Sequence, residues 1–472
     1  MSRGRRALLD LAVLAALGGV CVASTARLGA ELDPGDFGRP LHVLAGVALA
    51  MLAPYLAAAG WVLLRRPPVL PALALVLVVA AGMRLVLVDE KPALSNDVYR
   101  YVWDGRVQAA GLNPYRFAPN APELVRLRDE AIYPRMNRLG VRTAYPPVAQ
   151  GIFAGLYRVE RDSVAWTKLA IVLFDLCSIG LLAYLLSRLR RPPAWALLYA
   201  WHPLVAFELG GAGHVEGLVV LLVLAALAAS FATGVVRTGL LLAAAALVKP
   251  YALLFLPALV RGRRALLLAA GIVVATVAVA YAPFVEVGLR VLGYLPGYLR
   301  EEGFTRGTRF YLLGLVDADP STALTAAYVV LAAALLLGLA ASFVLRPTDA
   351  RDALASRALL LFATVWVLTS PTYPWYALLA IALLPLARGP VLIPAGAIAL
   401  TAPFLYLHIS VGSHPAWPRH LAYGLPALAL AAALVRLARR RRAVASSRTP
   451  SANETLARKP SPAAARSVEA KT

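Results

Sequence analysis

Carboxylates, arginines and aromatic residues are concentrated in one stretch of an otherwise apolar chain, residues 95–106 (SNDVYRYVWDGR). Asp97 and Asp104 lie seven positions apart in it, with Arg100 and Tyr101 between them. An ionised carboxylate within reach of a hydroxyl serves as a general base. We therefore predict that both aspartates are catalytic, with Asp97 as the base and Asp104 as its helper. The same pattern also fits an Asp97 that only caps a helix and an Asp104 that only pairs with Arg100.

The spacing of these residues predicts one helix that starts at Asp97 and ends near Ala110. Ser95 or Asn96 would cap it. The positive end of the helix dipole would keep Asp97 ionised, as a base requires. A period of about 3.6 residues per turn places four side chains on one polar face: Asp97, Tyr101, Asp104 and Gln108.

The composition is that of an integral membrane protein. Of the 472 residues, 60% are hydrophobic, and the mean hydropathy is +0.69, whereas soluble proteins are closer to half apolar. Two cysteines, Cys21 and Cys177, are too few for a disulfide framework or a zinc site. Part of the net charge of +22 lies in the segment that begins with the arginines at 439–442, which is typical of a cytoplasmic anchor. We therefore expect membrane lipids as partners and no nucleic acid.

Apolar runs separated by basic loops predict an all-α fold with about twelve membrane crossings. A re-entrant pair is expected in addition, broken at Lys249-Pro250, because a buried lysine and a broken helix are tolerated only against protein or water. The basic loops place both termini in the cytoplasm of an inner or plasma membrane and the large first loop, about 89–163, outside. We expect one membrane domain over 1–438 and a disordered, basic tail over 439–472. The expected spans are 7–28, 41–64, 69–88, 164–187, 194–209, 214–231, 265–287, 322–345, 358–370, 375–386, 391–410 and 421–437.

Ionisable residues inside apolar runs are costly in a membrane and therefore suggest function. A glycine-rich turn at 210–216 (GGAGHVE) brings His214 and Glu216 between two spans on the outer side. These two residues could orient an acceptor or contact a phosphate, although an ordinary turn at the water boundary has the same composition. Lys249 fits an anionic head-group site, and it also fits a lysine that extends to the membrane surface.

Other polar residues give weaker signals. Arg306 belongs to an outer loop rich in arginine, which binds phosphate bidentately, but a solvated charge run is an equal interpretation. Asp175 lies within a span and is expected to pair with a neighbouring helix. The aromatic segment 369–376 (TSPTYPWY) is typical of a membrane-interface belt and also suits the face of a sugar. No metal site is expected from the histidine spacing.

Three features make the chain resemble the polyprenol-phosphate-dependent glycosyltransferases of the GT-C fold, in particular the bacterial mannosyltransferases that build mannosylated lipids and lipomannan. More loosely, it is similar to the GPI-anchor mannosyltransferase I family. An acidic motif follows an early span, a Gly-x-Asn-Pro-Tyr and a Tyr-Pro-Pro element close the first outer loop, and a Pro-Leu-x-x-x-Glu segment runs into a glycine-rich turn. Here these features are Asn96-Asp97, 111–115, 145–147, 203–208 and 213–216.

The resemblance implies a GT-C-type fold and an inverting transfer of a hexose, mannose in the related bacterial enzymes. The donor would be a polyprenyl-phosphate sugar, and the acceptor a lipid or glycan on the extracytoplasmic face. Asp97 would deprotonate the acceptor hydroxyl, and the reaction would need no cofactor or metal. We expect substrate contacts from Arg100, Tyr101, Asn113, Tyr115, Tyr145, His214, Glu216, Lys249 and Arg306.

Two other functions would also require ionisable residues within the membrane. One is a lipid or glycan transporter or flippase, against which the lack of a detectable internal repeat argues. The other is a ligase that uses a lipid-diphosphate-linked sugar, which would release lipid diphosphate.

Overall fold

A computed structural model describes residues 2–32, 41–93, 95–410 and 416–446 of the chain. Helices make up 77% of it, and within these residues there is no strand. The all-α fold is therefore confirmed. The last helix, α21, runs through Leu425–Ser446, and the rest of the predicted basic tail, 447–472, lies outside the described residues.

Eight helical segments of the described chain are long and apolar enough to cross a membrane, or up to 9 if one bent pair counts as a span. They are α1 (Arg3–Glu31), α3 (Val69–Val88), α6 (Val164–Arg188), α12 (Gly262–Tyr281) with its continuation to Glu301, α15 (Thr322–Leu345), α16 (Arg351–Thr369), α18–α19 (Leu392–Ile409) and α20–α21 (Trp417–Arg439). The bent pair joins Pro203–Gly211 to Glu216–Phe231 (α9) at an angle of 119°.

This count does not confirm the predicted twelve crossings. Prolines break several apolar runs into segments shorter than the roughly 20 residues that a straight span needs. The run predicted at 375–386 consists of η7 (Pro374–Ala377), α17 (Leu378–Leu383) and η8 (Leu384–Leu386). The described helices thus support a multi-pass protein without fixing the number of passes.

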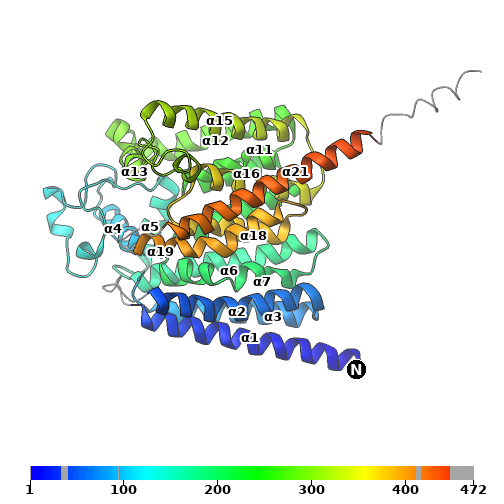
Figure 1. The fold of residues 1–472 in the computed structure, drawn as a ribbon. Coiled ribbons are helices and arrows are strands. Elements are labelled where there is room, and N and C mark those ends of the chain that lie inside the picture. Colours follow the sequence, from blue (N-terminus) through cyan, green and yellow to red (C-terminus); the bar gives the residue numbers. More distant parts are fainter. Residues whose placement is uncertain (1, 33–40, 94, 411–415, 447–472) are drawn as a thin grey trace, which may run out of the picture.

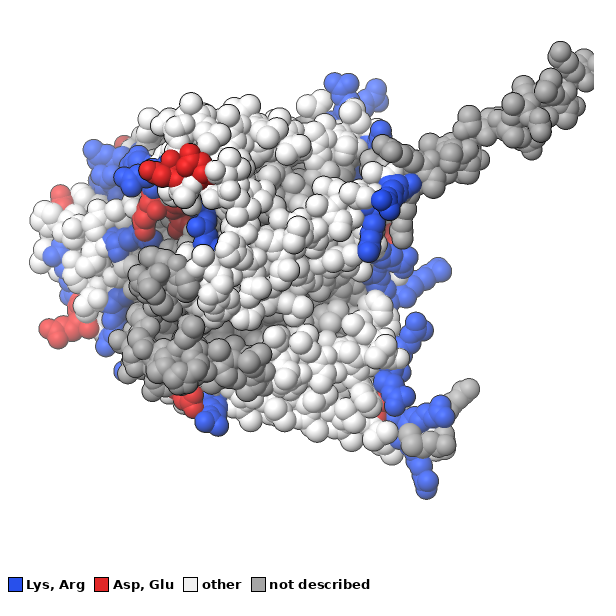
Figure 2. All heavy atoms as spheres, in the orientation of Figure 1, with Lys and Arg blue, Asp and Glu red and all other residues white. Residues whose placement is uncertain are grey.

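The long helices form a bundle with a charged region at each end. In Figure 1, α1, α2 (Leu41–Arg65) and α3 pack together at one edge, and α12 and α15 lie at the opposite edge. The start of α1 and the end of α21 lie at the same end of the bundle. Figure 2 shows a broad uncharged band, with mostly Lys and Arg at that end and residues of both signs at the other. An uncharged band of this kind is the surface that a bilayer covers.

The segment around Lys249 turns back on itself. Helix α10 (Val235–Ala246) packs against η5 (Pro250–Phe255), which continues into α11 (Leu256–Leu259). Arg261, which follows α11, lies beside the loop before α16, because its Nε donates to the Thr348 carbonyl at 3.0 Å. The helical run is therefore broken at Lys249-Pro250, between α10 and η5, and the re-entrant pair stays a prediction.

A buried ion pair fixes the helices beneath the glycine-rich turn. Arg84 of α3 donates to Asp175 of α6 at 2.7 Å, and both side chains are fully buried. Tyr199 donates to the other oxygen of Asp175 at 2.6 Å. A Cβ on Gly210 would lie 2.9 Å from the Arg84 backbone, so this turn packs directly on α3. The predicted pairing of Asp175 with a neighbouring helix is confirmed.

Candidate active site

Helix α4 (Asp97–Ala109) holds the acidic motif and begins at the predicted residue. The Asp97 backbone N–H donates to Ser95 Oγ at 3.3 Å. The side chain of Asn96 makes no capping bond and instead accepts a hydrogen bond from Asn137 at 2.8 Å. Residues 98–107 of α4 are buried, so this helix packs against protein on most of its surface. It lies outside the bundle of long helices, at the end where the charges are mixed (Figures 1 and 2).

Two hydrogen bonds fix the carboxylate of Asp97. Asn137 Nδ2 donates to Oδ1 at 3.0 Å, and the Tyr145 hydroxyl donates to Oδ2 at 3.1 Å. Burial by itself would raise the pKa of Asp97, but the positive charges of His214 and Lys249 act against it. Together with the two hydrogen bonds, these charges lower the pKa of Asp97 below the usual aspartate value. Asp97 is therefore ionised and partly exposed, as a general base must be.

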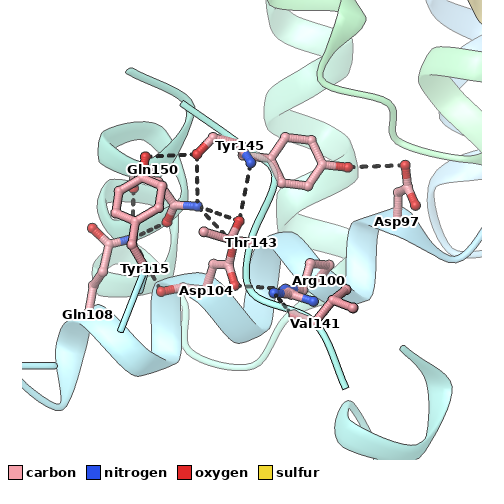
Figure 3. Close-up of polar contacts among 9 residues, drawn as sticks. All are labelled: Asp97, Arg100, Asp104, Gln108, Tyr115, Val141, Thr143, Tyr145 and Gln150. Atoms are coloured by element: carbon pink, nitrogen blue, oxygen red, sulfur yellow. Dashed lines mark hydrogen bonds and ion pairs between the residues drawn. The ribbon is translucent and has the colours of Figure 1, made fainter. Parts of the chain in front are cut away.

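Asp104 has a different environment. Its Oδ1 accepts a hydrogen bond from Arg100 at 2.9 Å, and its Oδ2 accepts from Thr143 at 2.5 Å and from Gln150 at 2.8 Å (Figure 3). The residue is only 2% exposed. Because its oxygens are all engaged with protein groups, Asp104 fixes the segment that leads to Tyr145. In Figure 3, Asp97 and Asp104 lie on opposite sides of that segment.

Residues of the Asn-Pro-Tyr element support the same segment. The buried Tyr115 hydroxyl donates to the Tyr145 carbonyl at 2.8 Å. Asn113 Oδ1 accepts from the Tyr115 backbone N–H at 3.0 Å, and its amide donates to Glu286 at 3.1 Å. The guanidinium of Arg100 donates to Asp104 and to the Val141 carbonyl. These contacts fix the backbone of the segment that carries Tyr145.

The glycine-rich turn delivers His214 to the site. Gly213 adopts φ +68°, and a Cβ there would lie 2.8 Å from the Lys168 side chain, so the turn requires glycine. The imidazole Nδ1 of His214 lies 2.8 Å from Glu208 Oε2, and both side chains are fully buried. Glu208 also accepts a hydrogen bond from the Tyr406 hydroxyl at 2.6 Å.

Lys249 joins this turn to the acidic motif. Its ammonium lies 3.0 Å from Glu216 Oε1 and 5.0 Å from the centre of the Tyr145 ring. The hydroxyl of that ring bonds Asp97. Tyr101 packs edge-on against Tyr145, with ring centres 5.1 Å apart, and its hydroxyl accepts the Val215 backbone N–H at 3.5 Å. The site therefore combines one ionised carboxylate with two cationic groups and several aromatic rings. Such a set deprotonates a hydroxyl and stabilises an anionic leaving group.

A family comparison agrees with this chemistry. The model for the N-terminal domain of the alpha-(1->6)-mannopyranosyltransferases matches residues 7–265, which is more than half of the chain. The chain belongs to this family. It is a GT-C-type mannosyltransferase and a multi-pass membrane protein. No curated protein and no solved structure matches it.

The predicted residues of the mannosyltransferase divide into three sets. One set meets around the carboxylate of Asp97: Tyr101, Tyr145, His214, Glu216 and Lys249. A second set fixes the segment that leads to Tyr145: Asp104, Arg100, Asn113 and Tyr115. Arg306 is exposed, and among the described residues no contact joins it to either set.

Sequence reasoning missed several groups of the candidate site. Asn137 lies 40 positions from Asp97 in a loop without a motif, so no pattern indicates it. Trp375 belongs to the aromatic segment 369–376, whose default interpretation is an interface belt. In the structure its ring is buried against His214, with centres 4.3 Å apart, and Tyr373 stacks on it at 4.2 Å. The alternation of aromatics with two prolines was the available signal for this second interpretation.

Proposed function

We propose that the enzyme transfers mannose from a polyprenyl-phosphate mannose to a hydroxyl of a lipid or glycan acceptor on the extracytoplasmic face, forming an alpha-(1->6) linkage. The observation that carries the proposal is the position of Asp97. It is an ionised, partly exposed carboxylate held by Asn137 and Tyr145 beside two cationic side chains. The family of the chain supports mannose as the sugar and transfer as the reaction.

The transfer is a single displacement. Asp97 takes the proton of the acceptor hydroxyl, and the oxygen attacks the anomeric carbon of mannose. A bond forms between that oxygen and the carbon, while the bond from the carbon to the phosphate oxygen breaks. The electron pair of the broken bond stays on the lipid phosphate. Because the displacement inverts the anomeric centre, an alpha product requires a beta-linked donor.

Positive charge assists the leaving phosphate. Lys249 and His214 lie close enough to Asp97 for their charges to act on it, so a donor bound in reach of Asp97 places its phosphate near the same two groups. Preorganised cations in a site of low dielectric stabilise charge that develops in the transition state. Glu216 keeps Lys249 charged and in place through their 3.0 Å ion pair.

The remaining predicted residues have supporting roles in this proposal. Asp104, Arg100, Asn113 and Tyr115 position the Tyr145 segment. Arg306 on the outer loop offers a contact for a large acceptor away from the reacting atoms. The uncharged band and the mainly basic end that contains the start of α1 support a cytoplasmic location for both termini (Figure 2).

The test uses the full chain in detergent with radiolabelled polyprenyl-phosphate mannose and a membrane lipid extract. Asp97→Asn removes the base, and Asp317→Asn makes the same change on an exposed loop as the matched control. We expect transfer by the unmodified enzyme and by Asp317→Asn, with lipid monophosphate as the by-product, and a loss of at least ~100-fold in Asp97→Asn. Equal transfer by Asp97→Asn would remove this residue from the mechanism, and lipid diphosphate as the by-product would indicate a ligase.

A further inference from the structure

Two ring nitrogens at the site have no hydrogen-bond partner among the described residues, His214 Nε2 and Trp375 Nε1. His214 is fully buried, and Trp375 is 7% exposed. Buried polar groups without partners are rare, because each loses its bonds to water without replacement. The two rings contact each other, with centres 4.3 Å apart. Two unpaired groups at one place suggest a shared ligand.

The hydrogen-bond partners of His214 determine which of its nitrogens faces that ligand. Nδ1 lies 2.8 Å from Glu208 Oε2. An ionised carboxylate only accepts hydrogen bonds, so Nδ1 carries a hydrogen and donates it. The other oxygen of Glu208 accepts from Tyr406 at 2.6 Å, which fixes the orientation of the carboxylate. Nε2 is therefore the atom of the ring that remains available.

The surroundings of His214 favour the protonated ring. Burial by itself would lower the pKa of His214, but the hydrogen bond to Glu208 and the charges of three carboxylates raise it above the usual histidine value: Glu208, Glu216 and Asp97. In an imidazolium both nitrogens are donors, so Nε2–H is a donor like the indole Nε1–H of Trp375, which has no acceptor function. A group that satisfies both must supply acceptors only, and an oxyanion does so best.

We propose that His214 Nε2–H and Trp375 Nε1–H together bind one oxyanion, the phosphate of the lipid carrier, and that Glu208 and Tyr406 are positioning residues for His214. This inference rests on the proposed function, because the phosphate is that of the proposed donor. Both Trp375 and Tyr406 lie outside the matched range 7–265, so the second half of the chain completes the phosphate site.

The two donors act on the bond that breaks. When the bond between the anomeric carbon and the phosphate oxygen breaks, its electron pair moves onto the phosphate. The two N–H groups then bond a more negative oxyanion than in the ground state, which lowers the barrier. The only proton that moves in the displacement passes from the acceptor hydroxyl to Asp97, so neither ring changes its protonation state. Stacking by Tyr373, with rings 8° from parallel, keeps the indole from rotating away.

The experiment measures binding of a short-chain prenyl phosphate to the full chain in detergent by calorimetry, with the corresponding prenol as the uncharged probe. Trp375→Phe removes the N–H and keeps a ring. Trp195→Phe is the matched control, because Trp195 Nε1 in η3 (Pro193–Ala196) also has no partner among the described residues. We expect Trp375→Phe to weaken prenyl phosphate binding roughly tenfold and to leave prenol binding unchanged. Trp195→Phe should bind both probes as the unmodified chain does.

Glu208→Gln provides a second variant if Trp375→Phe unfolds, and thermal unfolding identifies such a case. Glu208→Gln should also weaken binding of prenyl phosphate selectively. In transfer assays it should lower kcat more than it raises KM for the donor, since the hydrogen bonds to the phosphate strengthen in the transition state. If Glu208 had a purely structural role, binding of prenyl phosphate and of prenol would weaken together. Equal affinity of Trp375→Phe and Trp195→Phe for prenyl phosphate would overturn the proposal.

The transfer assay separates failure of this inference from failure of the proposed function. Transfer by the unmodified enzyme with no selective loss in Trp375→Phe would leave the function standing and remove the indole from the phosphate site. Selective loss of phosphate binding without any mannosyl transfer by the unmodified enzyme would support the phosphate site and contradict the proposed reaction.

Discussion

The hydroxyl of Tyr145 donates a hydrogen bond to the carboxylate of Asp97 at 3.1 Å, although 48 positions separate the two residues. The same ring lies beneath the ammonium of Lys249, 5.0 Å from it. Tyr145 therefore connects the proposed base to a proposed phosphate-binding cation. Its backbone carbonyl is fixed in turn by Tyr115.

Replacing Tyr145 by Phe should lower kcat about tenfold, because a hydrogen bond to an ionised carboxylate is lost while the ring beneath Lys249 stays. Initial rates of mannosyl transfer would measure this. Tyr184→Phe, on an exposed part of α6, is the control and should be neutral. A Tyr145→Phe enzyme with unchanged kcat would show that this bond does not orient the base.

The pH dependence of kcat/KM should lack an acid limb from Asp97 in the neutral range. The lowered pKa of Asp97 means that its carboxylate stays ionised as the pH falls to the usual aspartate value and below it. Asn137→Ala removes a hydrogen bond from the charged form of Asp97, so the pKa of Asp97 should rise. The loss of rate at acid pH should then begin at a higher pH than in the unmodified enzyme. Rates between about pH 4 and 8 would test this. A limb near pH ~6 in the unmodified enzyme that moves further up in Asn137→Ala would contradict the lowered pKa.

Asp104→Asn should reduce stability rather than chemistry. The change leaves the buried guanidinium of Arg100 without its carboxylate, which costs on the order of 3 kcal/mol. Thermal unfolding in detergent would measure it. Asp162→Asn is a suitable control, because Asp162 is half exposed and Arg106 keeps Asp129 as a partner; it should cost no more than about 1 kcal/mol. A stable Asp104→Asn enzyme without activity would instead make Asp104 a reacting group, as the sequence predicts.

The two ends of the chain should both be cytoplasmic. A fluorescent protein fused after residue 472 should fluoresce, and a protease site inserted near the exposed Glu123 in the first loop should be cut from outside the cell. The physical reason is the concentration of Lys and Arg at the end of the bundle that contains the start of α1 (Figure 2). Cleavage only after the membrane is opened would reverse the orientation.

Local patterns in the sequence predicted long apolar helices and the start of α4 at Asp97. Apolar runs at 69–88 and 322–345 coincide with α3 and α15, because about 20 consecutive apolar residues suffice to define a span. The start of α4 at Asp97 follows from the polar residues before it and the period after it. Motif resemblance then indicated the mannosyltransferase family, which the match over 7–265 confirms.

Only the tertiary structure decided what each of these residues contacts. The distinct environments of Asp97 and Asp104, two acids on one helix face, depend on loop residues such as Asn137 and Thr143, which no spacing rule connects to α4. Trp375 changed from an interface aromatic to a neighbour of His214 for the same reason. Helix periodicity depends on neighbours in sequence, whereas a site that joins residues 97, 145, 214, 249 and 375 depends on how the whole bundle packs.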